Sequence, residues 1–463
     1  MLVMKFGGTS VGVPAHCERA LEAVRLRLHL EPVVVVSALA GVTNQLVELC
    51  RPGEAREALL DHVETRHLQH ARALGVAGET VTGLLLALRA DPALAARGEP
   101  VGREARDRVL AYGERLAAEL FAAALTARGT EAHAAHAGEA GLVTDDRFGQ
   151  ANPLPEAPAR LRSFFARRHG VPVVTGFIGA TLDGRTTTLG RGGSDYSAAL
   201  LGAALGAGEI QIWTDTSGML SADPRVVPEA RPVPRLSFAE ACELAYFGAR
   251  VLHPKTLLPA MERGIPVRVL NTAQPQDVGS LITAEAETTP HGWRVKSIAS
   301  KRNITAVTIA STRMLLAHGF LARVFEVFGR HHVVVDLVTT SEVSISVTVD
   351  DTTHLEAAVA ELEGIGRVDV RRDLAVVAVV GEGAPTQVGL AGHVFTLLGG
   401  VGVPVEMISQ GASRVNLSFV VAGNEAARVV RLLHRGLGLD AEGAEPATVE
   451  PAAEATLRAT RDR

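Results

Sequence analysis

Lys5-Phe6-Gly7-Gly8-Thr9-Ser10 is the first of two glycine-rich turns that decide how this chain folds, and Leu189-Gly190-Arg191-Gly192-Gly193-Ser194-Asp195 is the second. Each turn follows a short apolar or β-branched run and precedes a helical pattern. Glycine lets backbone N–H groups turn towards an anion and approach it closely, and a helix N-terminus adds partial positive charge. Lys5 and Arg191 supply full charges. The pair of turns therefore predicts a site for several phosphates, or for a phosphate and a carboxylate.

The composition is that of a globular protein with two or three domains. Its 463 residues are too many for one ordinary core, and 47% of them are hydrophobic against 21% charged. A net charge of -5 without a long basic block argues against a nucleic-acid partner. The cysteines, Cys17, Cys50 and Cys242, are too few and too scattered for a disulfide framework or a metal site, which favours a reducing compartment. With no signal-peptide pattern and no membrane-spanning stretch, we expect a cytoplasmic protein.

Strand and helix patterns alternate along the first part of the chain. This alternation predicts an α/β fold with a mostly parallel sheet and helices on both faces. The all-apolar run Val33-Val34-Val35-Val36 suits a strand that is buried on both sides. The expected strands are 2–6, 32–37, 171–175, 209–214 and 266–270, and the expected helices include 104–127 and 195–205.

Residues 54–97 differ from this alternation, because they read as a helical insertion or lid rich in Glu, Arg and His. His62, His67 and His70 cluster within it. A solvated helix face is favoured over a metal site here, because the set of ligands is incomplete.

The C-terminal part contains an internal repeat after a Thr-, Glu- and Pro-rich linker near 284–292. Val324-Phe325 recurs 70 positions later as Val394-Phe395 (394 − 324), and the strand patterns that follow each pair also match. Each copy reads as helix, strand, turn, strand and helix. We expect two small α+β units packed sheet to sheet, followed after Ala441 by a mobile or short helical tail.

The first turn matches neither the Walker A nor the Rossmann pattern, because Lys5 precedes the glycines. From a strand end, a lysine can point back over phosphates bound by the amides of Gly7 and Gly8. There it would neutralise charge on a transferred phosphoryl group. A plain glycine turn beside a surface lysine is the alternative.

Other strand ends carry polar side chains where ligands bind in open α/β sheets. Ser37-Ala38-Leu39-Ala40-Gly41-Val42-Thr43-Asn44 follows the buried valine strand, although Thr43 is equally explained as a helix N-cap. Trp213-Thr214-Asp215 ends another strand and can hydrogen-bond adenine or ribose, and Arg225 can reach phosphates. His253, before a proline, is expected to be structural.

Tyr112-Gly113-Glu114-Arg115 interrupts a long helical pattern with a glycine that costs about 1 kcal/mol relative to alanine. A carboxylate beside such a break is a candidate for binding a substrate ammonium group. The alternative is that Glu114 is simply solvated.

Taken in order, these segments closely resemble the aspartate kinase family, and in particular its monofunctional, lysine-sensitive group. The matching stretches are KFGGTSVG (5–12), SALAGVTN (37–44), YGER (112–115), TGFIGA (175–180), TTTLGRGGSDYSAALL (186–201), IWTD (212–215), ADPRVV (222–227) and FGARVLHP (247–254). The repeat resembles the paired ACT domains of that family. The resemblance implies an amino-acid kinase domain at 1–285, a linker at 286–303, ACT domains at 304–374 and 375–441, and a tail at 442–463.

The resemblance also implies a reaction: transfer of the γ-phosphoryl group of ATP to the side-chain carboxylate of L-aspartate, which opens the route to lysine, threonine and methionine. Mg2+ would be held mainly through phosphates, without a dedicated metal site. The implied catalytic residues are Lys5, Gly7, Gly8 and Asp195; those around aspartate are Ser37, Thr43, Glu114, Phe177, Arg191 and Ser194; those around ATP are Lys5, Ser10, Thr214, Asp215, Leu220, Arg225 and Arg250.

Two positions depart from the family pattern. The family usually has Lys where this chain has Arg250, and its lysine-sensitive group often has an aromatic residue where Leu220 stands. A planar guanidinium replaces a point charge in the first case. The second removes an expected aromatic contact to the nucleotide.

The first repeat unit contains MLLAHGFLARVF (314–325) and VVVDLVTTSEVSISVTVD (333–350), which resemble the lysine-sensitive group. By this resemblance lysine would be a feedback inhibitor, and the chain would form a homodimer or a dimer of dimers through its ACT domains. Asp336 or Glu342 would receive the ε-ammonium. The implied lysine pocket is Met314, Val335, Asp336, Thr340, Ser341 and Glu342. Ordinary turn and strand roles for these residues are the alternative, because related ACT units differ in ligand.

Two rival functions stay open at this point. One is a kinase for glutamate, acetylglutamate or a nucleotide, against which the ACT pair and FGARVLHP argue. The other is an inactive amino-acid sensor, against which Lys5, Arg191 and Asp195 argue.

Overall fold

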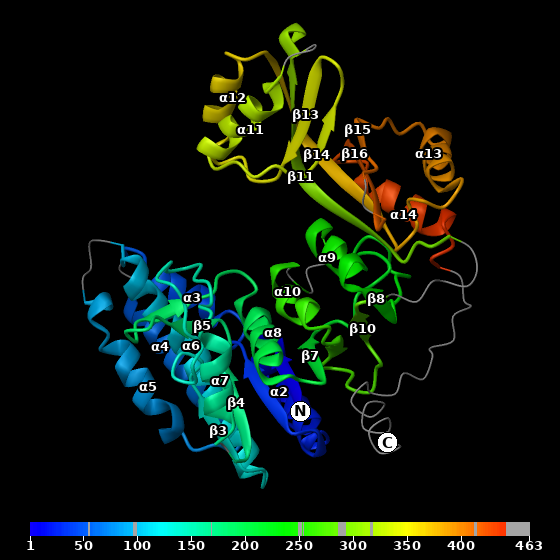
Figure 1. Ribbon diagram of the computed structural model, residues 1–463. Coiled ribbons are helices and arrows are strands. Elements are labelled where there is room, and N and C mark those ends of the chain that lie inside the picture. Colours follow the sequence, from blue (N-terminus) through cyan, green and yellow to red (C-terminus); the bar gives the residue numbers. More distant parts are fainter. Residues whose placement is uncertain are drawn as a thin grey trace.

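The computed structural model describes residues 1–53, 56–95, 100–167, 169–248, 252, 254–285, 293–314, 318–411 and 414–440. The chain forms a larger N-terminal part and a smaller C-terminal part that meet near helix α9 (Phe238–Phe247) (Figure 1). The tail from Ala441 onward lies outside the described residues, as does most of the Thr-, Glu- and Pro-rich stretch expected as a linker.

An eight-stranded sheet in the order β3-β4-β2-β1-β7-β9-β10-β8 organises the N-terminal part. Neighbouring strands run parallel except for β9 and β10, which are antiparallel. The mostly parallel sheet expected from the sequence is confirmed. The strands are β1 (Leu2–Phe6), β2 (Pro32–Val36), β3 (Ala132–Ala135), β4 (Val171–Thr175), β7 (Glu209–Thr214), β8 (Arg235–Ser237), β9 (Val267–Asn271) and β10 (Ser280–Thr283).

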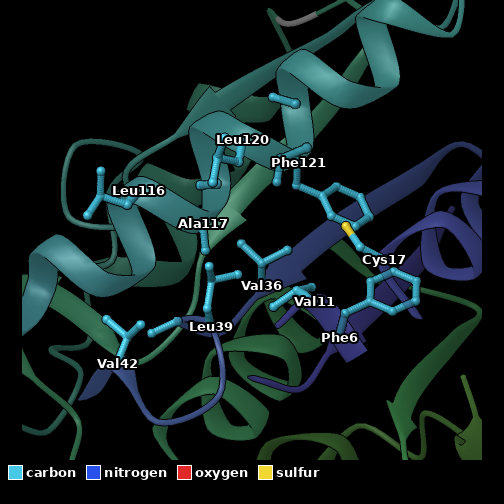
Figure 2. Packing of buried hydrophobic residues seen from close by; sticks show 14 of the residues in the cluster. Phe6, Val11, Cys17, Val36, Leu39, Val42, Leu116, Ala117, Leu120 and Phe121 are labelled. Atoms are coloured by element: carbon cyan, nitrogen blue, oxygen red, sulfur yellow. The ribbon is translucent and has the colours of Figure 1, made fainter. Parts of the chain in front are cut away.

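Helices cover both faces of this sheet, because alternate residues of the buried strands point to opposite sides. Phe6 and Val36 face one core with Phe121 of α6, and Val3 and Val35 face the other. Figure 2 shows the first core. Its helices are α1 (Gly8–Val11), α2 (Pro14–Arg25), η1 (Leu28–Leu30), α3 (Val42–Leu49) and α6 (Arg103–Ala127); the second core has α7 (Ala157–Phe165), α8 (Gly193–Leu205), α9 and α10 (Pro254–Glu262).

The expected insertion is helical and adds an outer layer against α3 and α6. It consists of α4 (Arg56–Ala73), α5 (Glu79–Arg89) and η2 (Pro92–Leu94). The expectation of a solvated histidine face is wrong for two of three residues: His62 is exposed, but His67 and His70 are buried. The described residues contain no cluster of three or more metal-ligating side chains.

The C-terminal part is built on one six-stranded sheet in the order β12-β13-β11-β14-β16-β15. The two repeat units therefore share a continuous sheet side by side, and the expectation that they pack sheet to sheet is wrong. The strands are β11 (Ser297–Ala310), β12 (Val338–Thr340), β13 (Ser344–Val349), β14 (Arg367–Val380), β15 (Met407–Ser409) and β16 (Asn416–Ala422).

The long strands β11 and β14 join the two units, and their pairing shifts register between Arg302 and Ala306. Asn303 on β11 and Asp373 on β14 have φ values of 60° and 55°. Residues 297–303, expected within a linker, instead form the first half of β11, so the expected linker is too long. The helices are η3 (Thr312–Met314), α11 (Phe320–Arg330), α12 (Leu355–Leu362), α13 (Leu390–Gly400) and α14 (Ala426–Gly436).

Helix α9 of the N-terminal part packs against β11 and β14. Ala241 and Phe247 of α9 share a core with Ala299 and Val376 of these strands. The helices of the repeat units belong to two separate cores. The N-terminal part and the repeat pair therefore meet through packed apolar side chains. Among the described residues, no helix combines the length and the apolar character that crossing a bilayer requires.

Candidate active site

The two glycine-rich turns lie together, as the sequence predicts. The ammonium of Lys5, near the end of β1, lies 2.5 Å from the Oδ1 atom of Asp195, in the first turn of α8. Only 10% of the Lys5 side chain and 14% of the Asp195 side chain are exposed. Gly190 and Gly192 have φ values of 77° and 71°, which favour glycine. The second turn thus brings a carboxylate directly to the lysine.

The backbone of the first turn differs from the expectation in one respect. The Gly7 amide donates a hydrogen bond to the Trp213 carbonyl at 3.1 Å, so it is not available to a phosphoryl group. Gly8 is required for packing, because a Cβ there would lie 2.8 Å from the carbonyl oxygen of Ala38. The amides of Gly8 and Thr9 open helix α1 and lack intrahelical acceptors. These two amides, unlike that of Gly7, are therefore the candidate anion donors of this turn.

Ser10, expected to contact ATP, is turned into the protein. It is 1% exposed, and its Oγ atom lies 3.2 Å from the Trp213 carbonyl and 2.7 Å from Oγ1 of Thr272. The hydroxyl therefore ties α1 to the carboxyl ends of β7 and β9, and the expected nucleotide contact is wrong in this structure. Thr272 was missed by sequence reasoning, although a polar pair directly after an apolar strand was a visible signal.

Glu114 is a buried acid on helix α6. The expected interruption at Gly113 is wrong, because α6 runs unbroken from Arg103 to Ala127. Gly113 instead permits close packing: a Cβ there would lie 2.8 Å from Cβ of Ala38. Glu114 Oε1 accepts a hydrogen bond from the Ala38 amide at 3.1 Å.

The second carboxyl oxygen of Glu114 is buried and has no hydrogen-bond partner among the described residues. Burial raises the pKa of Glu114 to about 8. The alternative of a solvated Glu114 is excluded by its 3% exposure. An acid in this state suits a ligand cation, which would satisfy the free oxygen and restore the charge.

The loop after β2 stands beside this acid. The Ser37 amide donates to the Phe6 carbonyl at 3.2 Å, which extends the pairing of β1 and β2 by one residue. Thr43 lies inside α3, whose N-cap is Gly41, so the alternative of Thr43 as an N-cap is wrong. Both side chains are half-buried at the carboxyl edge of the sheet.

Phe177 holds an unusual backbone conformation next to the second turn. Its φ is 66°, a left-handed value that is strained for a bulky residue. The Phe177 amide donates to Ser197 Oγ at 3.0 Å, and the ring covers Gly193, where a Cβ would lie 2.7 Å from Cδ2 of Phe177. Ser194 faces Gly176 just as closely. The strained loop therefore packs closely against the first turn of α8 and holds it in place. The hairpin β5 (Ile178–Ala180) and β6 (Thr186–Thr188) links the two segments.

A cavity of about 860 Å³ opens beside these groups. Arg191 and Asp195 of the second turn line it, together with Arg225. The volume is in the range of small-molecule and cofactor sites. Arg225 is paired with Asp223 at 2.6 Å, and its side chain is 70% exposed, so it remains accessible.

The other residues expected to bind the nucleotide do not line this cavity among the described residues. Thr214 ends β7, where its hydroxyl donates to Asp215 Oδ1 at 3.2 Å. Leu220 is half-buried, its carbonyl accepts a hydrogen bond from Ser297 at 2.8 Å, and it is not among the described residues that line the cavity. Arg250 and His253 lie outside the described residues.

The residues expected to bind lysine divide into two groups. Met314 and Val335 pack against the core of the first repeat unit. Thr340, Ser341 and Glu342 are exposed at the end of β12 and in the following turn. Asp336 differs from both groups, because only 2% of its side chain is exposed.

Comparison with known proteins places this geometry in a family. Residues 1–271 match the amino acid kinase family, and residues 307–364 and 377–437 match the ACT domain. The chain is 39% identical over 456 residues to Aspartokinase 3, chloroplastic, of Arabidopsis thaliana, covering 93% of this chain and 80% of that protein. It is 38% identical over 455 residues to Lysine-sensitive aspartokinase 3 of Escherichia coli (strain K12), covering 94% and 99%.

Solved structures agree with these matches. The crystal structure of E. coli aspartokinase III in complex with aspartate and ADP (R-state) superposes with a TM-score of 0.81 at 37% identity, covering 94% of this chain and 99% of that one. The complex with lysine and aspartate (T-state) gives a TM-score of 0.76 at 38% identity, covering 95% and 99%. An amino acid kinase domain followed by an ACT pair, with these identities along nearly the whole chain, means that this protein belongs to the aspartokinase family.

Proposed function

We propose that this enzyme transfers the γ-phosphoryl group of ATP to the side-chain carboxylate of L-aspartate, giving 4-phospho-L-aspartate and ADP. A carboxylate oxygen forms the new bond to phosphorus as the bond to the β-phosphate oxygen breaks. The acceptor is already ionised at neutral pH, so no general base is needed, and catalysis reduces to positioning and charge neutralisation. The observation that carries the proposal is the buried pair of Lys5 and Asp195 beside the cavity.

Lys5 supplies the positive charge for the transferring phosphoryl group in this proposal. Asp195 holds the ammonium in place, since the two groups are 2.5 Å apart and little exposed. The amides of Gly8 and Thr9 take the part expected for Gly7 and Gly8, because the Gly7 amide is engaged by Trp213. Fixed donors of this kind act without reorganising during the reaction.

Aspartate lies between Glu114 and Arg191 in the proposed complex. The unpartnered, buried oxygen of Glu114 receives the α-ammonium, and the exposed Arg191 pairs with a carboxylate. Guanidinium groups bind carboxylates in a bidentate manner. The remaining groups proposed for this pocket are Ser37 and Phe177, from loops, and Thr43 and Ser194, from the first turns of α3 and α8.

In this proposal the phosphates of ATP meet Arg225 in the cavity of about 860 Å³, and its nucleoside extends out of the cavity to Thr214 and Asp215 at the end of β7. Mg2+ neutralises phosphate oxygens in such a complex. Arg250 is proposed as a further phosphate contact on the family resemblance alone.

The domain boundaries that we propose are a kinase domain at 1–285 and ACT domains at 304–374 and 375–441, with 297–303 belonging to the regulatory sheet. Lysine is the proposed inhibitor, bound at the first ACT unit near Asp336. A homodimer formed through the ACT sheet is also proposed, because β12 and β15 are its edge strands. The relative from E. coli carries lysine sensitivity in its name.

An ADP-release assay across candidate acceptors tests the reaction. Aspartate should be turned over, whereas glutamate, acetylglutamate and nucleotides should not. Turnover of glutamate without aspartate would replace the assignment with the rival kinase. Amino-acid binding without any turnover would instead support the sensor. Titration of lysine, threonine and methionine against the rate tests the effector, and a response to threonine alone would overturn the choice of lysine.

A further inference from the structure

Asp336 is a buried carboxyl group at the boundary between the kinase domain and the first ACT unit. Its Oδ1 atom accepts a hydrogen bond from the hydroxyl of Tyr246, which lies on helix α9. Its Oδ2 atom is buried and has no hydrogen-bond partner among the described residues. Burial, and then the nearby Asp350, raise the pKa of Asp336 to about 7. One oxygen of this acid is thus left for a cation.

The cation that approaches it belongs to the chain itself. The Lys301 ammonium, on β11, lies 3.7 Å from Asp336 Oδ2 and 2.7 Å from Asp350 Oδ2. It also lies 4.4 Å from the centre of the Tyr246 ring, within cation–π distance. Two carboxyl groups therefore share one ammonium. Lys301 is 22% exposed and Asp336 only 2%, so the lysine side chain reaches solvent whereas the acid does not.

This cluster borders the active-site cavity. Tyr246, Lys301 and Asp350 line the same cavity as Arg191 and Asp195. A change in the position of Lys301 therefore alters the wall of the cavity and, through Tyr246, the surroundings of helix α9.

We propose that the Lys301 ammonium occupies the position taken by the side-chain ammonium of the inhibitory diamino acid, and that the effector must displace it from between Asp336 and Asp350. This inference rests on the proposed lysine inhibition and adds to it an internal competitor. The effector can bind only when Lys301 has left this position. Its apparent affinity is therefore its intrinsic affinity multiplied by the fraction of time that the position is free. The effector's ammonium then faces the Tyr246 ring in place of Lys301, and the covalent link that Lys301 provides between β11 and this position beside α9 is lost.

The arrangement also explains selectivity for a long diamino acid. A ligand without a terminal ammonium cannot replace Lys301, because the buried carboxyl group of Asp336 would be left without a counter-ion. Norleucine has the carbon chain of lysine and lacks that ammonium. It is therefore the probe that separates displacement of Lys301 from simple filling of the pocket.

The test is calorimetric binding of free lysine to the wild type and to Lys301→Met, which keeps the length of the side chain and removes its charge. The measurement is made at about pH 8.5, above the raised pKa of Asp336, so that the acid is ionised. Removal of the competitor should tighten lysine binding by about fivefold or more. Norleucine should bind weakly to both proteins.

Arg302→Met is the matched control, because it removes one positive charge at the adjacent position. It should leave lysine affinity within about twofold of the wild type, as expected when a partly screened charge outside the cluster is lost. Lys301→Gln replaces Lys301→Met if the latter fails to give a cooperative thermal transition. Asp336→Asn should abolish lysine binding at millimolar concentration.

Unchanged or weaker binding of lysine to both Lys301 variants would overturn the proposal, because the two ammonium groups would then share the acids instead of competing. Absence of lysine binding to every variant would overturn it as well. These outcomes are independent of the kinase assignment, which is tested by turnover of aspartate in the absence of lysine.

Discussion

Lys5 and Asp195 form an ion pair of 2.5 Å that joins the end of β1 to the first turn of α8. Each residue comes from one of the two glycine-rich turns. Because both side chains are little exposed, the pair is held in a setting where its charge is weakly screened. The position of the lysine ammonium is therefore fixed before substrates arrive, which is the condition for electrostatic stabilisation without reorganisation.

The first prediction concerns this pair. Lys5→Met should lower kcat by roughly 10³-fold, because the charge aimed at the phosphoryl group is lost. Asp195→Asn should lower kcat less, because the ammonium remains but is held less firmly. ADP release measures both, and circular dichroism checks that the proteins are folded. A Lys5→Met enzyme with a rate near that of the wild type would contradict the assigned role.

The second prediction concerns protons and Glu114. Its pKa is raised to about 8 by burial, so the carboxyl group of the free enzyme is mostly protonated at pH 7. If the aspartate ammonium binds the ionised form, binding at pH 7 should release close to one proton, and affinity should increase as the pH rises towards 8. Calorimetry in buffers of different ionisation enthalpy measures this release. Glu114→Gln should abolish it and raise KM for aspartate by roughly 10-fold to 100-fold.

The third prediction separates helix propensity from packing. Gly113→Ala would gain about 1 kcal/mol of helix propensity, but the new Cβ would lie 2.8 Å from Cβ of Ala38, and such overpacking costs about 1–3 kcal/mol. We expect a net loss of stability and a higher KM for aspartate, because the loop that Glu114 contacts must shift. Urea unfolding and steady-state kinetics measure the two effects.

Gly83→Ala is the control for that change. Gly83 lies on helix α5, and a Cβ there would meet no atom within 4 Å. This variant should be more stable by up to about 1 kcal/mol and kinetically unchanged. Equal stability changes at the two glycines would show that the close approach at Gly113 does not matter.

The fourth prediction concerns acid stability. Burial lowers the pKa of His67 from 6.5 to about 4. In the unfolded chain, His67 therefore becomes protonated as the pH falls below 6.5, whereas in the folded chain it stays neutral until about pH 4. His67 contributes stability that is fully present above pH 6.5 and is lost as the pH falls, by about 2 kcal/mol between pH 7.5 and 5.

His67→Leu should remove this part of the pH dependence in urea unfolding. His62→Gln, an exposed histidine on the same helix, should leave it unchanged. A steep loss of stability that persists in His67→Leu would assign the effect to another group. His70 is the first candidate, because burial also lowers its pKa.

Residues whose surroundings are set by their own neighbours were predictable from the sequence. The strands at 2–6 and 171–175 have the expected bounds, because an apolar or β-branched run between turn residues is by itself enough to predict a strand. The nearness of Lys5 and Asp195 was also predictable. The first turn follows β1 of the mostly parallel sheet and the second follows β6 of the two-stranded hairpin, so what made the nearness predictable was the matching glycine-and-cation chemistry of the two turns.

Other residues depend on contacts that the local pattern does not record. Gly113 looks like a break in a helix, yet it allows α6 to approach Ala38. Ser10 looks like a nucleotide ligand, yet its hydroxyl binds Thr272 from a distant strand. His67 looks like part of a polar face, yet the outer helical layer buries it.

The sequence by itself determined the elements, the sheet type, the repeat and the charged groups of the catalytic turns, since these follow from periodicity and from residue chemistry over short stretches. The tertiary structure decided which amides are free, which acids are buried and which domain each side chain faces. Lys301 illustrates the difference, because its charge is evident in the sequence while its position between Asp336 and Asp350 arises only when β11 pairs with β13. Burial and distance set the energy of a charge, and both are properties of the folded chain.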